Sequence, residues 1–222
     1  RTGADVFLAL ARCPHLLVVA LHGRQQAPRE IDREPAVRGH RDGDIGEVRM
    51  IHIEYVQGYN HTLLPGEEAG DAGWRLRPDR VGMSTVLGDI GSHVHHLARF
   101  VTDLDFDRVL ADVTAIVPGR KTDDTGSVLF RLENGAPGNM WLTQAGAGAV
   151  HGLRFNVFGT KGGLQWFEEE PNRLFFARPG EPALTFERGG PGMKPEAARA
   201  QRLFMGHPEG FQEAVAVLYA DV

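Results

Sequence analysis

The fold is decided by residues 126–143, GSVLFRLENGAPGNMWLT, in which two runs of β-forming residues flank an Asn-Gly pair. Asn-Gly between two such runs is the strongest short-range signal for a β-hairpin. We therefore expect strands at 126–133 and 138–143, joined by a turn at Asn134-Gly135. This hairpin places the middle of the chain in an antiparallel sheet.

Strand signals continue on both sides of this hairpin. They are short runs rich in β-branched and aromatic residues, bounded by Gly, Pro and Asn. Upstream and downstream, these runs occupy 47–56, 108–117, 153–158, 164–167, 174–177 and 183–186. With the hairpin, the sequence predicts about eight strands.

A helix interrupts the strand series between the first strand and the hairpin. Apolar residues recur there at helical spacing and make one stripe, with Ser84 or Thr85 as caps and an end near Thr102-Asp103. The stripe consists of Ile90, Val94, Leu97 and Val101. A long Gly- and Pro-rich stretch at 58–82 precedes this helix and is interpreted as a functional loop.

A second helix is expected at 206–222, with Pro208 in its first turn and His207 capping it. Many strands and few helices predict the α+β class. The expected architecture is a large open, predominantly antiparallel sheet with helices on one face.

Composition excludes several classes of protein. The 222 residues are 42% hydrophobic and 24% charged, which argues against disorder and fibrous structure. A net charge of −5 argues against a nucleic-acid partner. The single cysteine, Cys13, forms no internal disulfide and indicates a reducing compartment, so we expect a cytoplasmic protein. The apolar run at 16–21 is too short to cross a membrane.

The densest group of chemically active side chains lies in GDIGSHVHH at 88–96. Asp89, His93 and His96 share one face of the expected helix, whereas His95 and Arg99 point away from it. A carboxylate one turn before an imidazole can orient it and raise its pKa. The pattern therefore suits a general acid/base or a polar substrate clamp.

Three interpretations of this group remain open on spacing alone. Asp89 can cap the helix while His93 and His96 fill semi-polar positions. The three side chains can bind a metal ion, although the sequence shows no second ligand cluster at suitable spacing, so no metal ligand is assigned. His93 can accept the hydroxyl proton of a substrate during hydride or proton chemistry.

Residues 88–93 resemble the Asp-x-x-x-His helix of the Gfo/Idh/MocA family, NAD(P)-dependent oxidoreductases that include glucose/fructose oxidoreductase and inositol dehydrogenases. The resemblance depends on a series of motifs in the family's order, spread over about 43 to 211. The others are GDIGEVR at 43–49, QGY at 57–59, WR at 74–75, DDT at 123–125, ENGA at 133–136, GTKGGL at 159–164 and GHPEGF at 206–211.

The resemblance implies a Rossmann domain followed by a dihydrodipicolinate-reductase-like C-terminal domain. We expect 1–42 to be a remnant of the nucleotide-binding domain or an irregular segment. Residues 43–222 would form the substrate-binding and oligomerisation domain. The printed sequence has neither a strand followed by G-x-G-x-x-G nor the family's Glu-Lys-Pro motif with its catalytic lysine. The cofactor implied by resemblance is NAD or NADP, and we expect this chain alone neither to bind it nor to be active.

The implied function is the substrate-binding part of an oxidoreductase that transfers hydride between NAD(P) and a sugar, polyol or similar hydroxylated molecule. The expected partners are that substrate and further copies of the chain, which would associate through the open sheet face; no membrane partner is expected. The alternatives are a non-catalytic ligand-binding or self-association module (a truncated homologue) and a metal-dependent enzyme. Carried over motif by motif, the expected catalytic residues are His93 and Asp89, and the expected substrate-binding residues are Trp74, Gln57, Asp124 and His96.

Overall fold

The computed structural model describes residues 44–62, 70–191, 193 and 195–220. The expectation for residues 1–42 therefore lies outside the described residues. The same holds for part of the loop expected at 58–82.

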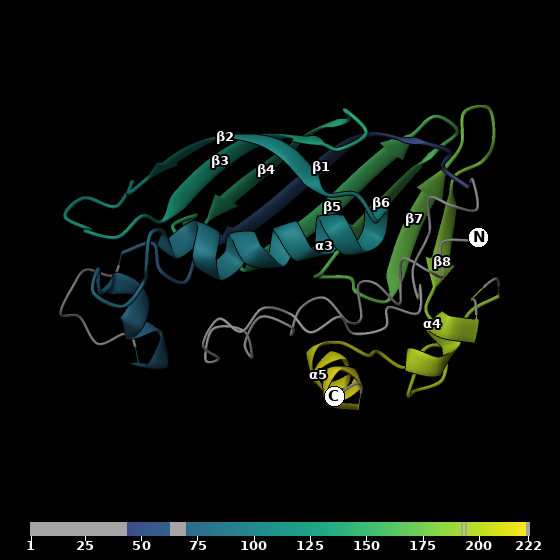
Figure 1. Cartoon of the computed structure of the whole chain (residues 1–222). Helices are drawn as coiled ribbons and strands as arrows, with labels where there is room; N and C mark the ends of the chain where they lie inside the picture. Colours follow the sequence, from purple (N-terminus) through teal and green to yellow (C-terminus); the bar gives the residue numbers. More distant parts are fainter. Residues whose placement is uncertain (1–43, 63–69, 192, 194, 221–222) are drawn as a thin grey trace.

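One mixed sheet of eight strands forms the body of the described domain, in the order β2-β3-β4-β1-β5-β6-β7-β8 (Figure 1). The strands are β1 (Val48–Gln57), β2 (Phe106–Thr114), β3 (Thr125–Leu132), β4 (Pro137–Thr143), β5 (His151–Gly159), β6 (Gly163–Phe167), β7 (Arg173–Ala177) and β8 (Leu184–Glu187). Each predicted strand has its counterpart. All neighbouring pairs are antiparallel except β1 and β4, which run parallel. The predicted α+β architecture is confirmed.

The hairpin between β3 and β4 turns at Asn134-Gly135, as predicted. Gly135 has a φ of 83°, which a residue with a side chain rarely adopts. The Asn134 side chain donates to the carbonyl of Val48 at 3.0 Å, and its Oδ1 accepts from the amide of Ala136 at 3.0 Å. The turn therefore also ties the hairpin to the start of β1.

The central helix begins as expected at Ser84, whose Oγ accepts from the amide of Leu87 at 3.1 Å. The carboxylate of Asp123 accepts from the amides of Thr85 and Val86 at 2.9 and 2.7 Å, so the helix N-terminus is already occupied by an anion. A π-helical turn, η2 (Leu87–Gly91), then leads into α3 (Ser92–Thr102). The sequence did not predict this π-turn.

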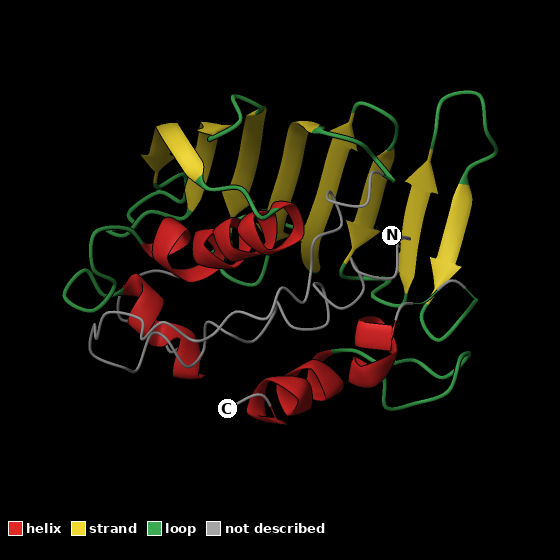
Figure 2. Ribbon diagram, turned by 45° about the vertical axis from the view of Figure 1, so that its right-hand side comes forward, coloured by secondary structure: helices red, strands yellow, loops and turns green. Residues whose placement is uncertain are grey.

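Helix α3 covers one face of the sheet (Figures 1 and 2). Its predicted apolar stripe is buried, and it ends at Thr102, followed by Asp103 with a φ of 56°. The helix lies so close to β4 that a Cβ at Gly91 would stand 3.0 Å from Cδ1 of Leu142. The core beneath it is formed by side chains that alternate inward along the central strands, including Ile53, Leu142 and Phe155.

Short helices complete the described domain: the 3-10 helix η1 (Gly70–Leu76), α4 (Pro195–Ala200) and α5 (Phe211–Ala220). The last helix begins later than predicted, so Pro208 lies before it and not in its first turn. The amide of Gly210 donates to Oε2 of Glu213 at 2.9 Å, so Glu213 caps this helix and His207 does not. No helix in the described part of the chain has the length and apolarity needed to span a membrane.

Candidate active site

Polar side chains gather at one edge of the sheet, where β1, β4 and β6 end and β5 begins. Because β1 and β4 are parallel and β5 is antiparallel to β1, their ends meet at the same edge. The first turns of the central helix lie over this edge and contribute two further side chains. We call this group the edge cluster; it consists of Tyr55, Gln57, Arg75, Asp89, His93, Gln144, His151 and Glu168.

Asp89 projects from the π-turn and is held by donors from two other elements. The Arg75 guanidinium binds it in a bidentate manner, with Nη2 3.1 Å from Oδ1 and Nε bonded to Oδ2. Nε2 of Gln144 donates to Oδ2 at 2.6 Å. The carboxylate is buried, with only 7% of the residue exposed. Asp89 is therefore a charge-paired hydrogen-bond acceptor, held by side chains of two other elements.

His93 lies one turn further along the same helix, with its ring edge-on to Tyr55 at a centroid distance of 6.1 Å. Burial lowers the pKa of this imidazole, and the charges of Asp89 and Glu168 act in the opposite direction without reversing the shift. The sequence predicted the direction in which Asp89 acts but not the net result. Arg75 lowers the His93 pKa further, because its positive charge opposes that of Asp89.

His96 follows on the same face and stacks on Phe100 at 5.9 Å. Burial lowers its pKa, with smaller contributions from neighbouring histidines. His95 packs against Phe106, and Arg99 pairs with Asp105, so these two side chains point away from the face of His93, as predicted. The role of His96 in substrate binding stays a prediction.

Trp74 and Gln57 both lie beside the residues that hold this site together. Trp74 is half-buried in η1, and the Arg75 guanidinium lies over its ring at 4.5 Å. Gln57 is buried at the end of β1 and its Nε2 is 3.0 Å from Nδ1 of His151. The structure thus brings Trp74, Gln57, Asp89 and His93 to one region.

The surroundings of Asp124 favour a structural role over the predicted role in substrate binding. Its side chain is fully buried and pairs with Arg120 at 2.9 Å. Its oxygens also accept from the amides of Ile116 and Val117 at 2.9 and 3.2 Å. All these contacts stabilise the loop between β2 and β3, so Asp124 is a structural anchor.

Sequence reasoning gave no role to five members of the edge cluster: Tyr55, Arg75, Gln144, His151 and Glu168. Arg75 stands in the Trp-Arg motif, beside the predicted Trp74. Gln144 follows β4 directly, and His151 begins β5. Their position at strand ends was the available signal, but it becomes informative only once the strand order is known.

A family model described as the GFO/IDH/MocA C-terminal domain matches residues 38–165. The chain belongs to this family. It is 32% identical over 179 residues to an uncharacterized oxidoreductase, YfiI, of Bacillus subtilis strain 168, which covers 80% of this chain and 46% of that protein. Gfo/Idh/MocA proteins are NAD(P)-dependent oxidoreductases, so the coarse class predicted from the motifs is confirmed.

Two solved structures of an inositol dehydrogenase homolog from Azotobacter vinelandii are similar to this Gfo/Idh/MocA domain. The complex with NAD+ has a TM-score of 0.77 at 30% identity, covering 98% of this chain and 50% of that one. The complex with NADH and myo-inositol has a TM-score of 0.73 at 29% identity, covering 98% and 48%. The chain thus spans about half the length of these relatives.

The described residues of this Gfo/Idh/MocA domain do not fit a dinucleotide. Pyrophosphate is usually bound by a glycine-rich turn that leads from a strand into a helix N-terminus. The glycine-rich segments at 146–148 and 159–163 instead join strand to strand, and the N-terminus of the central helix is occupied by Asp123. We therefore derive no step of the chemistry from a cofactor bound here.

A metal-dependent mechanism finds no support in the geometry either. Among the residues described, no group of three or more His, Cys, Asp or Glu side chains is placed to hold a metal ion. The oxygens of Asp89 are engaged by the donors of Arg75 and Gln144, an arrangement suited to an ion pair.

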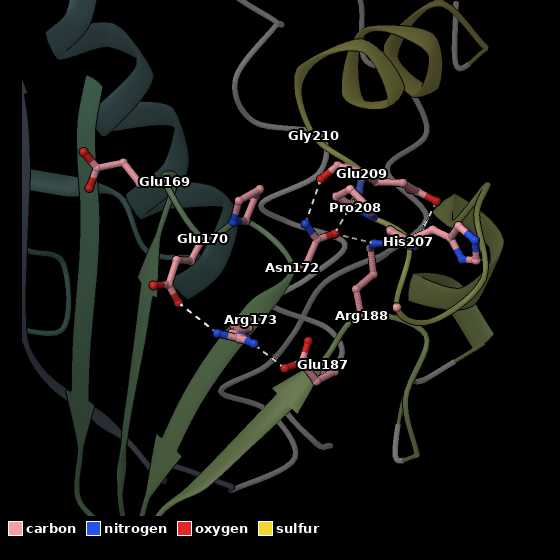
Figure 3. A pocket seen from close by; sticks show the side chains of 12 residues that line it. Glu169, Glu170, Asn172, Arg173, Glu187, Arg188, His207, Pro208, Glu209 and Gly210 are labelled. Carbon is pink, nitrogen blue, oxygen red and sulfur yellow. Dashed lines mark hydrogen bonds and ion pairs between the residues drawn. The ribbon is translucent and has the colours of Figure 1, made fainter. Parts of the chain in front are cut away.

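A separate hollow of about 560 Å³ lies where β7 begins and β8 ends (Figure 3). The polar groups in its wall bind one another. Arg188 donates to Asn172 at 2.7 Å and to Glu209 at 2.8 Å, and Arg173 pairs with Glu187 at 2.8 Å. These contacts attach the segment before α5 to the sheet, so this hollow is a structural junction outside the edge cluster.

Proposed function

We propose that this domain is the substrate-binding and proton-accepting part of an oxidoreductase that acts on a sugar, polyol or related hydroxylated small molecule. The observation that carries the proposal is that a partly buried imidazole, His93, lies one turn after the charge-paired carboxylate of Asp89. The relative described as complexed with NADH and myo-inositol supports the choice of substrate class.

The assignment of roles follows from the surroundings of each side chain. Because burial lowers the pKa of His93, the imidazole is neutral near neutral pH and can accept a hydroxyl proton. Asp89 already accepts three hydrogen bonds from Arg75 and Gln144, which leaves about one lone pair, on Oδ1, to accept a hydrogen bond from a substrate hydroxyl.

The complete oxidation needs more than these residues. The role of His93 would be to accept the proton of the substrate carbinol at its imidazole nitrogen. A nicotinamide, which a nucleotide-binding unit would supply, would provide the hydride acceptor for the carbinol carbon. Trp74 and Gln57 would form the wall of the substrate site. We propose that the described residues orient the substrate and accept its proton. We also propose that the 222-residue chain alone does not catalyse the oxidation.

The test measures binding of myo-inositol to the 222-residue chain by calorimetry and ligand-observed NMR. His93→Gln should weaken binding at least about tenfold, equivalent to about 1.4 kcal/mol. His95→Gln is the matched control on the same helix and should bind normally, because His95 packs against Phe106. Unchanged affinity in His93→Gln would overturn the assignment of the acid/base. Turnover with NAD+ or NADP+ would overturn the expected inactivity.

A self-association module is the second candidate, favoured by the face of the sheet opposite α3. Large apolar side chains are exposed there, including Leu129 and Trp141. Exposed apolar patches of this kind commonly mark protein interfaces. We propose that two copies pack through this face, which is compatible with the enzymatic role. Light scattering should show a dimer that Trp141→Arg dissociates, and a monomeric wild type would contradict the proposal.

A further inference from the structure

Tyr55 lies between two histidines in the edge cluster. The ring of His93, on α3, is edge-on to the ring of Tyr55 at a centroid distance of 6.1 Å. The ring of His151, at the start of β5, is edge-on to the same ring at 5.1 Å. Oη of Tyr55 is 2.6 Å from Nε2 of His151, a short hydrogen bond. A ligand held at His93 therefore lies next to a phenol whose hydroxyl is bonded to a second imidazole.

His151 is held from three directions. Gln57 contacts its Nδ1 at 3.0 Å, while both Tyr55 and a carboxylate oxygen of Glu168 lie near its Nε2, the latter at 3.3 Å. Glu168 follows β6, where its amide donates to the carbonyl of Leu153 at 2.9 Å and so continues the sheet ladder. The position of the carboxylate beside His151 is thus fixed by the backbone.

The two histidines differ in their electrostatics. The Glu168 carboxylate raises the pKa of His151 above its ordinary value despite burial, whereas burial lowers that of His93. About half of the His151 side chain is exposed, so it can exchange protons with solvent. The surroundings of His151 therefore favour its protonated form, whereas those of His93 favour its neutral form.

The charge of His151 decides the direction of its hydrogen bond with Tyr55. In a protonated His151 neither ring nitrogen can accept, so Nε2–H donates to the phenol oxygen, which is nearer than the Glu168 carboxylate. The Gln57 amide then has to present its Oε1, in place of its Nε2, to the Nδ1–H. The hydroxyl proton of Tyr55 then points to another acceptor. Burial raises the pKa of Tyr55, so the phenol keeps its proton and remains a donor.

We propose that His151, held by Glu168 and Gln57, is a positioning residue that turns the Tyr55 hydroxyl into a donor toward an oxygen of the polyol bound at His93. The proposal rests on the proposed function and extends it to a second hydroxyl, which favours substrates with neighbouring hydroxyl groups. The titratable and charged groups that face Tyr55, His93 and His151 are Tyr59 on the loop after β1, Arg75 on η1, Asp89 on the π-turn, and Glu168 and Glu169 after β6.

The experiment follows His151 by NMR and myo-inositol affinity by calorimetry across pH, in the 222-residue chain. Glu168→Gln should lower the measured pKa of His151 by about one pH unit, and the pH at which affinity falls should move down with it. Tyr55→Phe keeps the ring contacts but should weaken binding of myo-inositol several-fold. It should also remove the fall in affinity that follows the titration of His151. Glu170→Gln is the matched control, since Glu170 pairs with the exposed Arg173 and should change neither quantity.

The outcomes separate this proposal from the proposed function. The positioning role is wrong if Tyr55→Phe binds myo-inositol like the wild type. It is also wrong if Glu168→Gln lowers the pKa of His151 but leaves the pH at which affinity falls unchanged. In both cases His93 keeps its assignment. If His93→Gln binds normally while Tyr55→Phe does not, the role of His93 fails and that of Tyr55 stands. A wild-type chain that does not bind myo-inositol overturns both.

Discussion

Replacing Arg75 by methionine removes the cation that pairs with Asp89 at the start of the central helix. The pair is largely shielded from water, with the Arg75 and Asp89 side chains 22% and 9% exposed. In the Arg75→Met variant, the carboxylate stays buried with Gln144 as its remaining described donor. Removing one partner of a buried ion pair typically destabilises a protein by about 3–5 kcal/mol.

We expect the lower end of that range, about 3 kcal/mol, because Arg75 is partly exposed and Gln144 remains. For a domain of this size, that loss corresponds to a fall in melting temperature of roughly 6–12 °C. Removing both charges in Arg75→Met, Asp89→Asn should restore about 2 kcal/mol, since no unpaired buried charge is left.

Urea denaturation of the wild type, the two single variants and the double variant gives the coupling free energy directly. Arg77→Met serves as control, because its pair with Asp79 is exposed to solvent and should contribute little to stability. The pKa of His93, followed by NMR, should rise in Arg75→Met as the opposing positive charge is lost. Additive effects of the two single replacements would refute the argument that Arg75 compensates the charge of Asp89.

Three further perturbations test other parts of the structure. Asp124→Asn should destabilise the chain by about 3 kcal/mol in the same urea assay, since it leaves a fully buried guanidinium without its anion. Gly159→Ala should lower the melting temperature strongly, because a Cβ there would stand 2.1 Å from the carbonyl oxygen of Ile45, whereas Gly88→Ala meets no atom within 4 Å and should be mild. Because burial lowers the pKa of His93, the unfolded chain binds its proton more readily, so the free energy of unfolding should fall as pH drops below about 6.5, and His93→Gln should make that fall shallower.

The strands and the apolar stripe of α3 could be predicted from the sequence because each depends on a local pattern. Alternation along β5, for example, buries Leu153, Phe155 and Val157 on one face, and the spacing of the helical stripe survives the π-turn. The parallel pairing of β1 with β4 could not be predicted in this way. It joins residues far apart in the sequence, and no short motif specifies it.

The site shows the same limit in its electrostatics. The spacing of Asp89 and His93 correctly placed both side chains in one region, but it could not give the sign of the net pKa shift of His93. That sign depends on burial under the rest of the domain and on Arg75, which another element contributes.

Adjacent carboxylates illustrate why a motif match does not by itself assign a ligand role. Asp123 accepts from the first amides of the central helix, whereas the next residue, Asp124, turns inward to Arg120. Both roles are structural, and both fix elements that frame the edge cluster. The side chains left to contact a substrate are those of the edge cluster, on the strand ends and on the helix above them, and the variants of His93 and Tyr55 distinguish which of them do so.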